Sequence, residues 1–198
     1  MDHSLHCRNA KINMDTKSKL HPRSKHRGGY DLEVLGEVNE DLKPFIFVNE
    51  YGRVTIDFFN DQAVIELNKA LLYKHYNLNY WGIPEGYLCP PVPGRADYIH
   101  YIADLFKGNP TLKGLDVGVG ANAIYPIIGH QEYGWKFVAS ETDEKAYENA
   151  LSIVNQNDDL KGNIDLRFQE NKNRFFQGII QKDELFDFTI CNPPFYSS

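Results

Sequence analysis

LKGLDVGVGAN, residues 112–122, is the stretch of sequence that decides the fold of this chain. Its first half is a short apolar run of strand length, and its glycines permit a tight turn into a helix. Similar apolar runs recur downstream, and segments with helical periodicity separate them. Alternation of strand and helix is typical of a parallel sheet with right-handed crossovers, so an α/β fold is predicted. The expected elements are strands at 112–117, 135–140, 164–168 and 186–191 and helices at 122–129, 143–157 and about 172–181.

Upstream of this region, residues 31–110 are expected to form a smaller subdomain of helices and a β-hairpin. Asp31 is a typical capping residue for the short helix that follows it. Two strand-like runs flank the turn sequence Asn-Glu-Tyr-Gly at residues 49–52, which favours a hairpin. Prolines, glycines and aromatic residues at 77–94 indicate a loop between two longer helices. The expected elements are helices at 32–38, 61–76 and 95–106 and strands at 45–48 and 54–58.

The composition is that of a chain with a hydrophobic core. Of its 198 residues 42% are hydrophobic and 13% aromatic, which suits one domain or one domain with an appendage. No apolar run approaches the roughly 20 residues that span a bilayer, and the first thirty residues lack the apolar core of a secretion signal. Cys7, Cys89 and Cys191 lie far apart and form no paired motif. We therefore expect a cytoplasmic protein without a membrane span, a disulfide framework or a metal site.

Charge is distributed unevenly along the chain. Residues 1–30 hold seven lysines and arginines against two aspartates, whereas the remainder carries a net charge of −11. Such asymmetry predicts a flexible basic arm, at residues 1–30, that reaches a polyanion from an acidic body. A solvated tail has the same composition and stays an alternative.

The glycine-rich turn predicts a nucleotide-type cofactor site. Gly118 and Gly120 allow backbone N–H groups to approach a ligand, and Glu141 ends the second strand 23 residues after Gly118. A carboxylate there can accept hydrogen bonds from ribose hydroxyls. The spacing to Ala123 also fits a dinucleotide fingerprint, but Asp116 would repel a pyrophosphate and favours a cationic ligand such as S-adenosylmethionine. An ordinary strand–helix turn is the simpler alternative.

A second motif, Asn192-Pro193-Pro194-Phe195, directly follows the fourth strand. If the strand order is 3-2-1-4, this motif lies beside the glycine-rich turn. The carboxamide oxygen of Asn192 and the carbonyl of Pro193 could then grip an amine and hold its lone pair toward an incoming methyl group. Phe195 offers a flat face for a base extruded from its helix. Prolines also end strands, so a plain strand stop is the alternative.

With both motifs, the chain resembles the RlmF family of adenine-N6 methyltransferases that act on 23S ribosomal RNA. This resemblance implies a Rossmann-like class I methyltransferase sheet, S-adenosylmethionine as cofactor, and ribosomal RNA or an assembling large subunit as partner. The stretches that carry it are His21-Pro22-Arg23, LCPPVPGRADYIH at 88–100, GVGANAIYP at 118–126 and CNPPF at 191–195.

The resemblance also implies roles for individual residues. The target adenine would be held and stacked by Asn192, Pro193, Pro194 and Phe195. The basic segment would grip RNA through Lys17, Lys19, Arg23, Lys25 and Arg27. The cofactor would be contacted by Arg95, Gly118, Gly120, Asn122, Glu141 and Asn171, to which the turn sequence adds Asp116.

The chain departs from this family at its end, because family members continue with further strands and this sequence stops three residues after Phe195. We expect an incomplete methyltransferase core over 111–198, with strand 186–191 as an open edge. Weak or absent activity of the 198-residue chain is the corresponding expectation. The alternatives are a non-catalytic RNA- or cofactor-binding fragment, an amino-methyltransferase acting on DNA adenine or protein glutamine, and a nicotinamide-dependent oxidoreductase, which Asp116 and the second motif disfavour.

Overall fold

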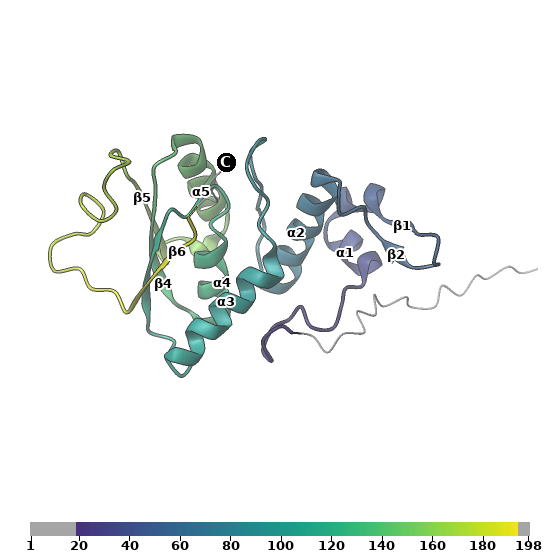
Figure 1. Ribbon diagram of the computed structural model, residues 1–198, viewed down its shortest axis with the longest axis horizontal. Helices are drawn as coiled ribbons and strands as arrows, with labels where there is room; N and C mark the ends of the chain where they lie inside the picture. Colours follow the sequence, from purple (N-terminus) through teal and green to yellow (C-terminus); the bar gives the residue numbers. More distant parts are fainter. Residues whose placement is uncertain (1–18, 194–198) are drawn as a thin grey trace, which may run out of the picture.

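The computed structural model describes residues 19–193 of the chain (Figure 1). A four-stranded sheet with its helices forms one end of the molecule, and a group of helices with a small hairpin forms the other. Among the described residues, no helix is both long and apolar enough to cross a bilayer.

The sheet is parallel throughout and has the strand order β5-β4-β3-β6. Numbered by their order in this half of the chain, these strands stand as 3-2-1-4, so the predicted order is confirmed. The carboxyl end of β6 therefore lies beside the carboxyl end of β3, where the glycine-rich turn begins. The strands are β3 (Lys113–Val117), β4 (Lys136–Glu141), β5 (Ile164–Phe168) and β6 (Phe188–Cys191).

Two helices, α4 (Ile124–Tyr133) and α5 (Glu144–Gln156), cover one face of this sheet (Figure 1). Asp143 caps α5 by accepting a hydrogen bond from the backbone N–H of Ala146 at 2.7 Å, as predicted. The opposite face has a small cluster, in which Ile179 from the β5–β6 loop covers Leu115 and Val138.

The N-terminal helices form as the periodicity predicts. Helix α1 (Leu32–Val38) begins after Asp31, and α2 (Asp61–Tyr76) begins after Asn60, which accepts hydrogen bonds from two backbone N–H groups of its first turn. Helix α3 (Val92–Leu105) packs on α4 and shares the core of the sheet. The short elements are the 3-10 helices Glu40–Phe45 and Asp158–Leu160 and the strands β1 (Phe47–Val48) and β2 (Val54–Thr55).

Several boundaries differ from the prediction. Helix α3 starts three residues earlier, because Pro93 is tolerated in a first turn, where its missing N–H would have no partner. Helix α4 runs on to Tyr133, and the 3-10 helix at Glu40–Phe45 was not predicted. The helix expected at about 172–181 is wrong, since Gly178 has a φ of +87° that no right-handed helix contains.

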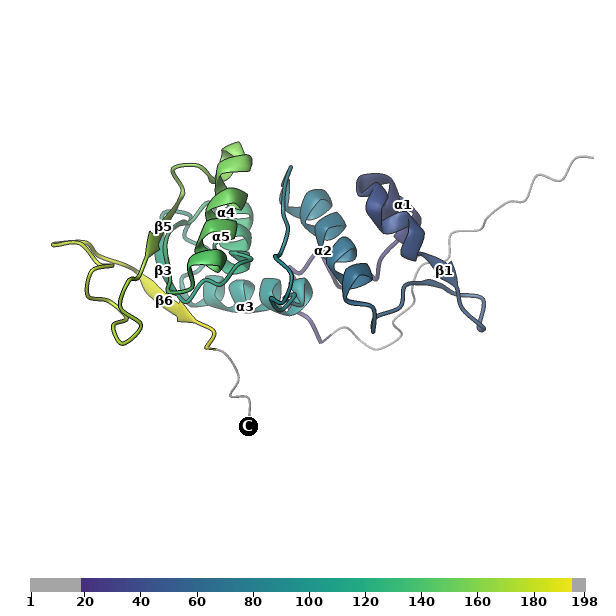
Figure 2. The same cartoon turned by 90° about the horizontal axis from the view of Figure 1, so that it is seen from above.

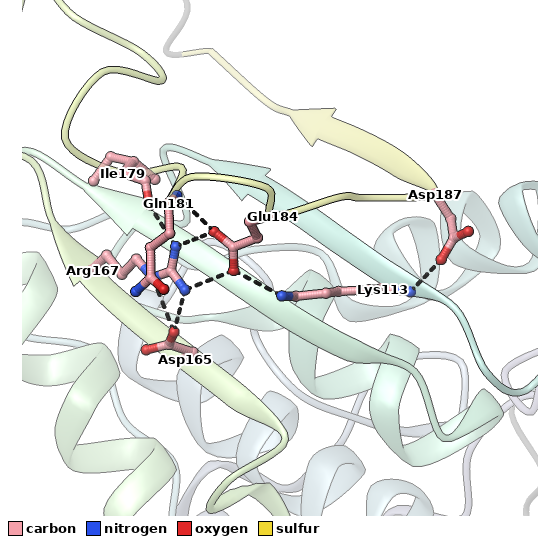
Figure 3. Close-up of polar contacts among 7 residues, drawn as sticks. All are labelled: Lys113, Asp165, Arg167, Ile179, Gln181, Glu184 and Asp187. Carbon is pink, nitrogen blue, oxygen red and sulfur yellow. Dashed lines mark hydrogen bonds and ion pairs between the residues drawn. The ribbon is translucent and has the colours of Figure 1, made fainter.

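An ion network holds this irregular segment on the sheet instead (Figure 3). Glu184 accepts hydrogen bonds from Arg167 on β5 at 2.6 and 2.9 Å and from Lys113 on β3 at 2.8 Å. Arg167 also donates to the carbonyl oxygen of Ile179 and to Asp165. The segment between β5 and β6 is therefore fixed by side chains of the sheet rather than by helical hydrogen bonds.

The basic segment differs most from expectation, because residues 19–30 lie against the body. Arg23 pairs with Asp104 on α3 at 2.6 Å and donates to Tyr133 on α4, and Lys25 pairs with Glu132 on α4 at 2.7 Å. Acidic side chains on α3 and α4 thus pair with two of the charges that predicted a free arm. The side chains of this segment that are buried are His21, Ser24 and His26.

A close approach of side chains at Gly114 sets the spacing of the sheet. A Cβ atom at this position would lie 2.6 Å from the ring of Phe137 and 2.7 Å from the ring of Phe188. We predict that Gly114→Ala lowers the free energy of unfolding by about 1–3 kcal/mol, as overpacking does. Gly94→Ala is the control, since no heavy atom lies within 4 Å of its Cβ position. Urea unfolding measures the stability of both variants and of the wild type. Equal stability of Gly114→Ala and the wild type would contradict the prediction.

The ion network yields a second prediction. Hydrogen bonds from Arg167 hold the pKa of Glu184 well below its ordinary value of 4.5, so its stabilising effect exists above that pH and is lost in acid. Glu184→Gln should lower the free energy of unfolding by about 1–3 kcal/mol at pH 7, with the difference from wild type shrinking below pH 4. Asp165→Asn, at an exposed partner, should cost less than about 1 kcal/mol. A pH-independent difference in urea unfolding would refute this.

Candidate functional site

A cavity of about 500 Å³ opens at the carboxyl ends of β3, β4 and β6. Ligands of open parallel sheets bind at this edge, and the volume lies in the range of small-molecule sites. It is lined by the glycine-rich turn, the end of β4, the proline-rich loop, the segment after β5 and the residues after β6. The predicted site residues that it brings together are Arg95, Gly118, Gly120, Asn122, Glu141, Asn192 and Pro193.

Glu141 fastens the glycine-rich turn to the end of β4. Its Oε2 accepts a hydrogen bond from the N–H of Gly120 at 2.8 Å, and its Oε1 accepts from the N–H groups of Thr142 and Asp143 at 2.7 and 3.0 Å. Gly118 and Gly120 have φ of +76° and +67°, which favours glycine at both positions. Each carboxylate oxygen accepts about two hydrogen bonds, so Oε2 keeps capacity for a ligand hydroxyl.

The buried Trp81 and the half-buried Asn149 hold the same turn by hydrogen bonds. The indole Nε1–H of Trp81 donates to the carbonyl oxygen of Asn122 at 2.9 Å. Asn149 on α5 donates to the carbonyl oxygens of Ala121 at 2.7 Å and Gly82 at 2.8 Å. The proline-rich loop and α5 therefore hold the turn in place. The N–H groups of Gly118 and Val119 both donate to the carbonyl oxygen of Ser140 at 2.9 Å, so these donors are used within the fold and are not free for a ligand, contrary to the expectation from sequence.

Asp116 lies behind the turn rather than on the cavity wall. Its side chain is 1% exposed, and within the described residues neither carboxylate oxygen has a hydrogen-bond partner. Burial, with a smaller contribution from the charge of Glu141, raises the pKa of Asp116 to about 8. A positive charge nearby would stabilise the ionised form of this carboxyl group and lower its pKa, whereas a negative charge would raise that pKa further.

Arg95 on α3 links three parts of the site. Its guanidinium donates to the hydroxyl of Tyr125 on α4 at 2.7 Å and to the carboxamide oxygen of Asn192 at 3.3 Å. It also lies 5.4 Å from the centre of the Tyr125 ring. The contact with Asn192 places the second motif at the cavity, beside the glycine-rich turn, although the two are 72 residues apart in sequence.

Two residues predicted to contact the cofactor, Asn171 and Asp116, do not line the cavity. Gln169 and Lys172, which are neighbours of Asn171, do line it. The N–H of Asn171 donates to the Gln169 side chain and its own side chain accepts from the N–H of Asn173, both at 3.0 Å. Pro194, Phe195 and Lys17 lie outside the described residues.

The basic residues predicted to contact RNA differ in whether an acidic side chain pairs with them. Arg23 and Lys25 are at the surface but are paired with acidic side chains, as described above. Lys19 and Arg27 are exposed, and Arg27 donates a long hydrogen bond to the carbonyl oxygen of Pro22. None of these four residues lines the cavity.

Sequence reasoning missed the residues at the cavity rim. The hydroxyl of Tyr87 donates to Asp143 at 2.5 Å, which ties the proline-rich loop to the start of α5. Lys172, Arg174 and Phe175 also line the cavity. Their position just after a parallel strand was a usable signal, because such segments always meet at the ligand-binding edge. This signal was overlooked because residues 172–181 were expected to form a helix.

Comparison with known proteins supplies the family. A family model described as RNA methyltransferase matches residues 14–198. The protein called ribosomal RNA large subunit methyltransferase F from Bacteroides thetaiotaomicron is 52% identical over 200 residues, covering 93% of this chain and 65% of that protein. The protein of the same name from Cytophaga hutchinsonii is 48% identical, with 96% and 62% covered. The chain thus spans somewhat less than two thirds of the length of these relatives.

Solved structures agree with this family. A crystal structure of the METTL16 MTase domain superposes with a TM-score of 0.82 at 31% identity, covering 91% of this chain and 71% of that chain. The N-terminal domain of human METTL16 in complex with SAH gives 0.81 at 31% identity, with 89% and 70% covered. The hMettl16 catalytic domain in complex with MAT2A 3'UTR hairpin 1 gives 0.79 at 32% identity, with 90% and 61% covered.

The Rossmann-like class I methyltransferase fold and the family predicted from the two motifs are therefore confirmed. On the match over residues 14–198 and the identity of about half to its relatives, this chain belongs to the RNA methyltransferase family that contains the large subunit methyltransferase F proteins.

Proposed function

We propose that this protein transfers a methyl group from S-adenosylmethionine to N6 of an adenine in 23S ribosomal RNA. The observation that carries the proposal is the cavity that brings the glycine-rich turn, Glu141 and Asn192 together at one edge of the sheet. The METTL16 structures with MAT2A 3'UTR hairpins support an RNA partner, and the names of the relatives support ribosomal RNA in particular.

The residues present fit S-adenosylmethionine. When bound, this cofactor supplies a methyl group on a positively charged sulfur. Asp116 provides a buried carboxyl group without a partner among the described residues, which a cation nearby would stabilise in its ionised form. Glu141 retains acceptor capacity for ribose hydroxyls, and Gly118 and Gly120, which line the cavity, let a ligand approach the backbone of the turn closely. The SAH-bound structure of human METTL16 supports the same assignment.

The roles of the second motif follow from hydrogen-bonding capacity. The carboxamide oxygen of Asn192 accepts from Arg95 at 3.3 Å, so its remaining lone pair can accept one hydrogen from an adenine amine. The carbonyl of Pro193 would accept the other hydrogen, which leaves the nitrogen lone pair directed at the methyl donor. No strong base is needed, because methylation makes the nitrogen a better acid and solvent can remove its proton. We assign the stacking role to Phe195, and Pro194 makes the step rigid.

We further propose a division of labour along the chain. Residues 111–198 would form the methyltransferase core, residues 31–110 a helical and hairpin subdomain, and residues 1–30 a basic RNA-binding segment. The exposed Lys19 and Arg27 support the last role more than Arg23 and Lys25, whose charges are already paired within the fold.

We predict that Asn192→Ala lowers methyl transfer by about 100-fold or more, since a positioned hydrogen-bond acceptor in a catalytic site contributes on this order. The assay is transfer of labelled methyl from S-adenosylmethionine to unmethylated 23S ribosomal RNA, with mass mapping of the modified adenine. Asn155→Ala, at an exposed position on α5, is the matched control. Calorimetry should show that both variants still bind the cofactor.

The same assay separates the competing functions. Methyl incorporation into DNA adenine or a protein glutamine, with none in ribosomal RNA, would overturn the proposed substrate. Binding of S-adenosylmethionine and RNA by the wild-type chain without any transfer would show a binding fragment instead of an enzyme. Equal activity of wild type and Asn192→Ala would remove Asn192 from the reaction.

The buried carboxyl group yields a prediction on pH. Because the pKa of Asp116 is raised from its ordinary 3.8 to about 8, the folded state holds a proton that the unfolded state releases between these values. The wild-type protein should therefore lose stability relative to Asp116→Asn as pH rises from 4 to 8, by at most about 1.4 kcal/mol per pH unit. Urea unfolding of both proteins at pH 5, 6, 7 and 8 tests this, and parallel profiles would contradict it.

A further inference from the structure

Large apolar side chains are exposed together on the β1–β2 hairpin and on the turn that joins it to α2. Their exposed fractions range from 47% to 98%, and the highest belongs to Phe59. Monomeric proteins rarely expose several large apolar residues within one short segment unless the segment binds something. The residues of this hairpin patch are Phe47, Val48, Tyr51, Phe58 and Phe59.

The backbone that carries the hairpin patch is held by hydrogen bonds. The side chain of Asn49 accepts from the N–H groups of Tyr51 and Arg53, both at 3.0 Å, which fixes the hairpin turn. Asp57 accepts from the N–H of Phe59 at 2.9 Å, and Asn60 then caps α2. Aromatic side chains on a fixed backbone lose little entropy on binding and often dominate the energy of an interface.

The surroundings of the hairpin patch are acidic. Residues 31–61 expose seven acidic side chains and only two basic ones, Lys43 and Arg53. Lys43 is already paired with Glu40 at 3.0 Å. A negative surface repels the phosphates of RNA and attracts a cationic partner. Charge complementarity therefore favours a cationic partner over RNA at this surface.

The hairpin patch is also remote from the cavity. Both views of the molecule place β1 at the opposite end from the sheet (Figure 1 and Figure 2). None of its residues lines the cavity, whereas Lys172 and Arg174 do. The basic rim suits RNA at the cavity, and the acidic aromatic surface suits a second partner at the far end.

We propose that the hairpin patch binds a lysine- and arginine-rich segment of another protein that carries apolar side chains among its basic ones. The apolar side chains pack on Phe58, Phe59 and Tyr51, and the basic side chains pair with the surrounding carboxylates, such as Glu50 and Asp57. This surface does not depend on the identity of the methyl acceptor.

The test measures fluorescence anisotropy of the full chain with three labelled 15-residue peptides. One peptide alternates Lys and Arg with Leu and Trp, a second replaces Leu and Trp by Ser, and a third replaces Lys and Arg by Glu. We expect the first peptide to bind at least tenfold more tightly than the other two. The double variant Phe58→Ser/Phe59→Ser should weaken that binding at least tenfold, and the charge reversal Glu50→Lys should weaken it severalfold.

Leu185→Ser is the control, because this leucine is 84% exposed but lies in the β5–β6 segment, and its binding should equal that of wild type. Thermal unfolding checks that the variants fold, and Tyr51→Ser replaces the phenylalanine variant if that one does not. Equal binding of all three peptides, or no binding, would overturn the proposal. The proposal would also be overturned if the phenylalanine variant kept its peptide binding but lost binding to a 23S ribosomal RNA fragment. The same holds if that variant kept its peptide binding but lost self-association, measured by sedimentation.

Discussion

The candidate site depends on the hydrogen bond between the N–H of Gly120 and the carboxylate of Glu141. This contact joins the turn after β3 to the end of β4, while further hydrogen bonds from Thr142 and Asp143 fix the same carboxylate. Because the turn needs positive φ at its glycines, a side chain at either position would strain it. The hydrogen bond between Gly120 and Glu141 therefore fixes the turn that forms one wall of the cavity.

Packing within the sheet places the residues after β6 beside this turn. Phe137 and Phe188 close over Gly114 from the two neighbouring strands, so β6 lies directly beside β3. Arg95 then reaches Asn192 from α3 and brings the residues after β6 to the cavity. In the proposed reaction this places the amine-holding groups next to the cofactor turn, and the mechanism requires only positioning by groups already held in place.

Prediction from sequence succeeded where local chemistry and periodicity agree. The strand order, the capping roles of Asp31 and Asp143 and the glycine-rich turn all follow from patterns of a few residues. It failed at 172–181, where a helix-compatible composition is overridden by the contacts of Glu184 with Arg167 and Lys113. It also failed at 19–30, where Arg23 and Lys25, two of the charges that predicted a free arm, are paired with acidic side chains on α3 and α4.

By itself the sequence determined the α/β fold, the family and the two motifs that mark the site, because each is written in short stretches with a specific spacing. Only the tertiary structure decided that Arg95 contacts Asn192, that Asp116 is buried without a partner among the described residues, and that the basic segment lies on α3 and α4. The physical reason is sequence separation. Contacts between residues tens of positions apart depend on how packed elements are placed in space, and no local pattern encodes that placement.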